Sequence, residues 1–147
     1  MEKEKLKVRE ELVYAIRITK QGKNDYHVDY PFEGMSISKG AGSFAEAVEL
    51  AGSSVEGALY DIFEKGSRRP EFDLDAVSRL EKNKKENEFI TFVSTSMETV
   101  LNKHGDGVVK RSVSFKQYQW HYIQKNNISL SKYVQGKVDE DIFAGRF

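Results

Sequence analysis

Residue types that carry catalysis are few in this sequence, and their spacing fits none of the common catalytic or metal-binding patterns. The chain has three histidines, His27, His104 and His121, and no cysteine. No pair of histidines has the HxxxH or HExxH spacing that places two imidazoles on one helix face around a metal ion. The nucleophile elbow GxSxG and the phosphate loop GxxxxGK[ST] are also missing. We therefore predict that the protein is not an enzyme and has no metal site and no cofactor.

A glycine pattern before the clearest predicted helix is similar to a dinucleotide-binding fingerprint but lacks its context. Gly40-x-Gly42-x-x-Ala45 follows a predicted strand and opens a helix. The fingerprint also requires a parallel strand and an acidic residue about 20 residues further on. Asp61 lies inside the continuing predicted helix, and the predicted sheet begins with an antiparallel hairpin. We interpret the glycines as a tight turn before the helix and predict no nucleotide binding.

Three carboxylates near the start of the chain, Asp25, Asp29 and Glu33, are close enough in sequence to be tested as a nuclease metal site. Asp25 falls in a predicted turn, and no carboxylate from a fourth strand or from the helix completes the set. The sequence therefore gives no support for a residual nuclease site. A stand-alone nuclease or an RNA-binding protein that uses the N-terminal sheet is kept as an alternative function. A second alternative is a stand-alone transcription regulator whose N-terminal domain senses a small ligand.

Charge is distributed unevenly along the chain. The 147 residues carry 23 Lys and Arg and 23 Asp and Glu, so the formal net charge is zero. Residues 1–66 have 9 basic and 12 acidic side chains, whereas residues 103–137 have seven basic side chains and one acidic one. A basic segment of this kind is typical of a surface that binds a polyanion. An acidic part and a basic part indicate two different binding tasks.

Composition predicts a folded protein with no membrane segment. Hydrophobic residues make up 39% of the chain and aromatic residues 12%, which is enough for a core. The charged start Met1–Lys5 has no apolar stretch behind it, and no run approaches the ~18 apolar residues of a membrane helix. The absence of cysteine excludes disulfides. We expect a cytoplasmic protein.

The N-terminal part has the pattern of a small antiparallel sheet covered by a helix. Leu12–Thr19 and Tyr26–Tyr30 are rich in β-branched and aromatic residues and flank a turn-like segment. Further strands are expected at Met35–Ser38 and Glu88–Thr95. Ser43-Phe44-Ala45-Glu46 is a capping box, and apolar residues follow it at helical spacing as far as Gly66. Together these elements predict a helix packed on a sheet.

Two segments are expected to connect the folded parts. Residues 67–87 have Arg68-Arg69-Pro70 at their start and a nearly all-charged end, which is typical of a surface excursion with at most a short helical turn near Leu74–Leu80. Lys103–Gly107 has the composition of a flexible boundary. The predicted domains are therefore 10–100 and 105–147.

The C-terminal part has the pattern of a strand followed by two helices. The strand is expected at Val108–Phe115, a helix at Lys116–Lys125 and a last helix from Ser129 as N-cap. So short a unit cannot bury its own apolar stripe, so we expect a homodimer, with a tetramer also open. Paired strands of two chains would present one polar row in the DNA major groove, and helix amides would hold a phosphate. The predicted DNA-binding residues are Lys110, Ser112, Ser114, Ser129, Ser131 and Lys132.

The order and spacing of these motifs resemble the HicB antitoxin family. The family pattern is Y-x-V-x-[FY]-P-D-x-x-G, then a strand, then [ST]-x-x-E-A opening a helix. Tyr26–Gly34 and Ser43–Ala47 follow this pattern, except that Phe32 stands where the family has Asp. Val109–Phe115 and Asn127–Ser131 are similar to the ribbon-helix-helix module that many HicB proteins carry at the C-terminus.

The resemblance implies a fold and a function. The fold is α+β, with a partial RNase H-like N-terminal domain that lacks nuclease carboxylates, followed by a ribbon-helix-helix module for dimerisation and DNA binding. The function is an antitoxin that binds and inhibits a HicA-type toxin, a small basic mRNA-cleaving RNase, and represses its own operon at operator DNA. The acidic N-terminal half and the resemblance together place the toxin contact on Tyr26, Asp29, Phe32 and Glu33.

Overall fold

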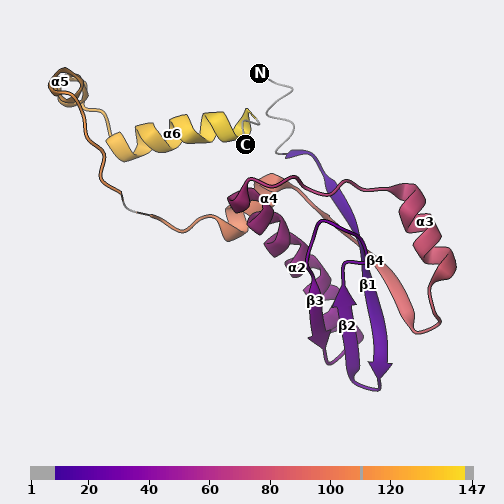
Figure 1. Ribbon diagram of the computed structural model, residues 1–147. Coiled ribbons are helices and arrows are strands. Elements are labelled where there is room, and N and C mark those ends of the chain that lie inside the picture. The colour runs from indigo at the N-terminus through magenta and orange to yellow at the C-terminus, as the bar shows by residue number, and fades with distance from the viewer. Residues whose placement is uncertain (1–8, 110, 145–147) are drawn as a thin grey trace. The chain divides into compact units, whose positions relative to one another are not determined.

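The computed structural model describes residues 9–109 and 111–144. The chain divides into a unit over Arg9–Asp106 and a unit that includes Gly107–Phe147, and each is described by itself. Within the described residues there are one four-stranded antiparallel sheet and five helices (Figure 1). The predicted α+β class is therefore confirmed.

The sheet of the first unit is centred on a long strand. β1 (Leu12–Gly22) pairs antiparallel with β2 (Asp25–Asp29) on one side and with β4 (Glu88–Thr95) on the other. β3 (Ser38–Ala41) pairs with β2, which gives the order β3-β2-β1-β4. The predicted hairpin and the return of a fourth strand to the sheet are thus confirmed.

The third strand begins later than its hydrophobic pattern predicts. The prediction of a strand over Met35–Ser38 is wrong at both ends, because pairing with β2 starts only at Ser38 and continues to Ala41. Pro31 has no N–H for a ladder, so the chain leaves the sheet after β2 and re-enters it several residues later. Met35 and Ile37 are buried without belonging to the strand. Burial rather than pairing explains their apolar character.

α2 (Phe44–Lys65) forms as predicted. Ser43 is the N-cap, and its side chain accepts a hydrogen bond from the amide of Glu46 at 3.1 Å. The Glu46 carboxylate accepts from the amide of Gly42 rather than from that of Ser43, at 2.9 Å. Gly66 ends the helix in the left-handed conformation with φ of 64°. The fully buried side chains on the sheet-facing stripe are Ala47, Ala51, Val55 and Leu59.

α3 (Leu74–Asn83) lies on the face of the sheet opposite α2 (Figure 1). Phe89 contacts Phe44 at the start of α2, with ring centroids 5.5 Å apart. Phe92 has the opposite parity along β4 and contacts Phe72, just before α3, at 6.4 Å. Opposite parity on one strand means opposite faces, so α2 covers one face and the segment entering α3 covers part of the other, where Phe92 is 57% exposed.

Residues 67–87 therefore form more structure than their composition predicts. Asp73 caps α3 by accepting a hydrogen bond from the amide of Ala76 at 3.1 Å, and Val77 is buried. The helical turn expected near Leu74–Leu80 is confirmed, but the helix continues three residues further, to Asn83, into the charged end of the segment. Charged residues fit there because most of the helix surface faces solvent.

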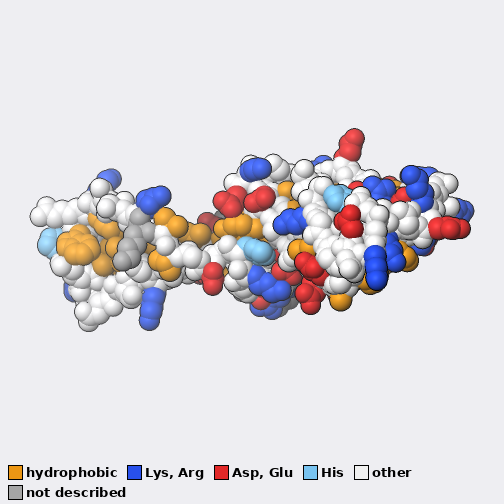
Figure 2. Space-filling view, turned by 90° about the horizontal axis from the view of Figure 1, so that it is seen from below, with side chains coloured by type: hydrophobic (Ala, Val, Ile, Leu, Met, Phe, Trp, Pro, Cys, Tyr) orange, Lys and Arg blue, Asp and Glu red, His pale blue; other side chains and the backbone are white. Residues whose placement is uncertain are grey.

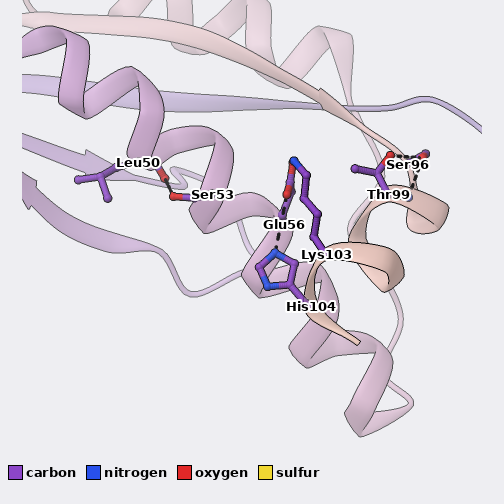
Figure 3. A network of polar contacts seen from close by, with 7 residues as sticks. All are labelled: Leu50, Ser53, Glu56, Ser96, Thr99, Lys103 and His104. Carbon is purple, nitrogen blue, oxygen red and sulfur yellow. Dashed lines mark hydrogen bonds and ion pairs between the residues drawn. The ribbon is translucent and has the colours of Figure 1, made fainter. Parts of the chain in front are cut away.

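α4 (Met97–His104) follows β4 and packs against α2. Met97 and Val100 are fully buried, and Ser96 caps the helix through the amide of Thr99 at 3.2 Å. Figure 3 shows Glu56 of α2 between Lys103 Nζ at 3.2 Å and His104 Nε2 at 3.7 Å. Lys103 and His104 thus belong to a docked helix, and the prediction of a flexible boundary is wrong for them.

The second unit contains two helices and no strand within its described residues. α5 (Gln117–Lys125) and α6 (Leu130–Phe143) are joined through Asn127, which has the left-handed φ of 49° expected for asparagine at such a break. The described part of the predicted strand is not paired. A strand needs the backbone groups of a neighbour, and in a ribbon that neighbour is a second chain. Nowhere in the described ranges is a helix both long and apolar enough to cross a membrane.

Candidate functional site

The structure does not bring the four predicted toxin-contacting residues together. Tyr26 lies on the face covered by α2, where its ring meets that of Phe44 at 6.1 Å. Asp29 has the opposite parity and is held on the other face by Arg17, with Nε–Oδ1 at 3.0 Å and Nη2–Oδ2 at 2.6 Å. This hydrogen bond raises the pKa of Arg17. The Asp29 carboxylate is therefore held in an ion pair with Arg17 on this face of the sheet and is not free.

Phe32 and Glu33 line a cavity of about 280 Å³ that the sequence did not reveal. One wall is the turn after β2, and the other is the segment that enters α3. The aromatic rings of Tyr14, Tyr30 and Phe32 follow one another edge to face, with centroid distances of 6.3 and 5.5 Å. The full lining is Tyr14, Ala15, Tyr30, Phe32, Glu33, Pro70, Glu71, Phe72, Asp73, Ala76 and Val77. We call this cavity the aromatic pocket.

Two contacts hold the walls of the aromatic pocket in place. The Tyr14 hydroxyl donates to the carbonyl oxygen of Pro70 at 3.0 Å, which ties the segment before α3 to β1. Gly34 lies against Pro70 from the other wall. Burial raises the pKa of both Tyr14 and Tyr30. The pocket is therefore a preformed feature of the first unit.

Sequence reasoning missed the second wall of the pocket, although a local signal was present. Asp73 is a residue type favoured at the N-cap and stands directly before Leu74, and Pro70 marks the break before it. These residues predict a helix start. No local pattern predicts that the segment before this helix returns to Tyr14 of β1, because that contact joins residues 56 positions apart.

The predicted DNA-binding residues lie at the surface wherever the structure describes them. Lys110 lies outside the described residues, while Ser112 and Ser114 are exposed on an unpaired segment. Ser129 is the N-cap of α6, but its side chain makes no capping hydrogen bond. Ser131 and Lys132 are exposed in the first helical turn. The first amides of any helix have no intrahelical acceptor, so this end has the donors that an anion requires.

The second unit also exposes an apolar groove of about 470 Å³ between α5 and α6. Not one described residue of this unit is buried, and Tyr118 and Tyr122 are 67% and 63% exposed. Figure 2 shows hydrophobic side chains at the surface of this unit, the smaller lobe of the view, with lysines around them. The groove is lined by Tyr118, Gln119, Tyr122, Ile123, Ile128, Leu130 and Tyr133. An exposed apolar surface of this kind is typical of an interaction site.

Comparison with known proteins finds a similarity of fold among the solved structures. No protein-family model matches the chain, and no curated protein matches it. Among solved structures, a chain of a toxin-antitoxin complex from Streptococcus pneumoniae is similar, with a TM-score of 0.50 and 11% sequence identity. The similarity covers 90% of this chain and 99% of that chain. The likeness is one of fold.

Metal chemistry has no evident place in the part of the chain that the structure describes. Among residues 9–109 and 111–144, no three His, Asp or Glu side chains come close enough to hold a metal ion. Asp25, Asp29 and Glu33 are separated, since Asp29 pairs with Arg17 and Glu33 belongs to the aromatic pocket. The described residues instead form the aromatic pocket, with three carboxylates on its lining, and an exposed apolar groove in the second unit.

Proposed function

We propose that this chain is an antitoxin of the HicB type, which inhibits a HicA-like toxin RNase through its first unit and represses its own operon through its second. The observation that carries the proposal is the likeness over 90% of the chain to a member of a toxin-antitoxin complex. The motif order in the sequence agrees with it independently. The protein acts by binding, without a catalytic step of its own.

The first unit has the surface that a basic partner requires. The aromatic pocket has three carboxylates on its lining and no Lys or Arg. A small RNase carries positive charge around its active site because it must bind the RNA backbone. Opposed charges across an interface raise the association rate and the specificity of binding. We therefore assign toxin binding to the first unit.

The second unit has the properties of a dimeric DNA-binding module. Its exposed apolar groove is suited to a second copy of the same unit, and the lysines around it to the phosphate backbone. In a dimer, residues 108–115 of two chains would complete each other as a two-stranded ribbon of a size that enters the major groove. Operator binding therefore requires the homodimer, because each chain supplies one strand of the two-stranded ribbon.

The deciding experiment tests the product of the open reading frame next to the gene that encodes this chain. We expect it to encode a small basic protein that arrests growth when expressed alone and is silenced when the full chain is co-expressed. The two proteins should co-purify, and the purified partner should cleave RNA only in the absence of this chain. A neighbouring product that is harmless alone, or one whose RNase activity the chain leaves unchanged, would contradict the proposal.

A further inference from the structure

We infer that the aromatic pocket receives an arginine or lysine side chain of the protein partner and is the centre of that interface. This inference depends on the proposed function for the identity of the partner, but not for the chemistry of the pocket. It differs from the sequence-based prediction, because only Phe32 and Glu33 of the predicted contact residues belong to the pocket.

The walls of the pocket are suited to a cation with an apolar stem. A positively charged group is attracted to the face of an aromatic ring, and the effect grows when water is excluded. Four aromatic residues line the pocket: Tyr14, Tyr30, Phe32 and Phe72. Tyr14 is 3% exposed and forms the floor, while Phe72 is 41% exposed and stands at the rim. The volume of about 280 Å³ leaves room for a side chain, since one water needs only about 10–15 Å³ on the same measure.

The charged groups of the lining all have the sign that attracts a cation, whereas Arg69, close enough to Tyr14 to lower its pKa, lies outside the lining. Glu33 is exposed, and the structure gives its carboxylate no partner among the described residues. Asp73 uses one oxygen, Oδ1, to cap α3. Glu71 makes an exposed ion pair of 3.6 Å with Arg68, which screens it in part. A cation entering the pocket therefore meets the unpaired carboxylate of Glu33 first.

The pocket is also rigid enough to act as an anchor site. The Tyr14 to Pro70 hydrogen bond and the contact of Gly34 with Pro70 fix both walls before any partner binds. A preformed pocket spares the ordering cost of binding, which is why such pockets hold the residues that dominate interface energies. The cationic side chain is expected to be that anchor.

The first test measures binding of the full chain to the purified product of the adjoining gene. Glu33→Lys and Phe32→Ala should each weaken binding roughly tenfold or more, as at other interface hot spots. The matched control is Glu49→Lys, which reverses the charge of an exposed carboxylate of α2 outside the pocket. The control should bind like the wild type. Equal affinity of wild type and Glu33→Lys would overturn the inference while leaving the proposed function intact.

The second test does not need the toxin. N-acetyl-arginine amide is titrated into the isotope-labelled full chain, and the backbone amide shifts are followed by NMR. Shifts are expected at residues 30–34 and 70–77, and they should be absent with the uncharged analogue N-acetyl-citrulline amide and in Glu33→Lys. Equal shifts with both compounds, or none at tens of millimolar arginine amide, would overturn the inference even if the toxin binds elsewhere. Circular dichroism of each variant excludes unfolding as the cause of lost binding.

Discussion

Gly34 lies directly against Pro70 of the aromatic pocket, although 36 positions separate them in the sequence. A Cβ atom on Gly34 would lie 2.9 Å from Cβ of Pro70, and Gly34 has φ of +109°, a conformation that side chains rarely adopt. Only glycine satisfies both conditions at once. The glycine that ends the Tyr26–Gly34 motif therefore sets how closely the segment before α3 approaches the sheet.

Replacing Gly34 by alanine should destabilise the first unit and open the aromatic pocket. Backbone strain at such a position costs about 1–3 kcal/mol, and displacement of Pro70 adds to it. We expect the melting temperature to fall by roughly 4–8 °C for each kcal/mol lost. Differential scanning calorimetry of the full chain measures the change.

The control for this prediction is Gly57→Ala. Gly57 lies inside α2 with no atom within 4 Å of its added Cβ, so alanine should stabilise the helix by about 0.5–1 kcal/mol. The free energy of unfolding should therefore fall in Gly34→Ala and rise in Gly57→Ala. A Gly34→Ala variant as stable as the wild type would show that the contact with Pro70 is not a constraint.

Stability of the first unit should fall at alkaline pH because of its buried tyrosines. Burial raises the pKa of Tyr14, partly offset by Arg69, and burial also raises the pKa of Tyr30, both from 10.0. Below pH 10 the phenols are protonated in both states and their contribution is fully present. Above it the unfolded chain loses protons first, so the free energy of unfolding decreases as the pH rises through the folded-state pKa values.

Urea unfolding between pH 8 and 11 measures this effect. Tyr30→Phe should show a smaller loss of stability over this range than the wild type, because phenylalanine has no proton to lose. Tyr118→Phe is the control, since Tyr118 is 67% exposed. If the free energy of unfolding depends on pH in the same way in the wild type and in Tyr30→Phe, the buried Tyr30 phenol does not cause the loss of stability.

The second unit should exist as a dimer at low micromolar concentration. Its exposed apolar side chains, among them Val113 at 63% and Tyr122 at 63%, have no cover within the described part of one chain. Val113→Lys would place two like charges at the expected dimer interface, and it should dissociate or unfold the module. Sedimentation equilibrium distinguishes the states, and a melting temperature that rises with protein concentration supports the dimer. A monomeric wild-type chain would rule out the ribbon.

The sequence predicts the elements of this protein better than the contacts between them. Strand and helix patterns at β1 and α2 arise from neighbouring residues, so they are visible without the fold. The aromatic pocket is formed by Tyr30–Glu33 and Pro70–Val77, which meet only after the sheet has formed. The parity of Tyr26 and Asp29 could have been used, since odd and even positions of one strand point to opposite faces.

The last prediction concerns DNA binding by residues 108–115. Lys110, Ser112 and Ser114 have the sequence parity opposite to Val113 and Phe115, so in a paired ribbon they form one outward row. Each lost base contact costs about 1–3 kcal/mol, and the dimer presents each substitution twice.

The triple variant Lys110→Ala, Ser112→Ala, Ser114→Ala should abolish specific binding to the upstream region of its own gene, with dimerisation and toxin inhibition unchanged. Gel shifts at a fixed, stated salt concentration measure this, because nonspecific contacts to phosphate weaken as salt rises. Ser131→Ala should have a smaller effect, since helix amides rather than the hydroxyl are expected to hold the phosphate there. If the triple variant binds this DNA as tightly as the wild type does, the segment is not the element that recognises the operator.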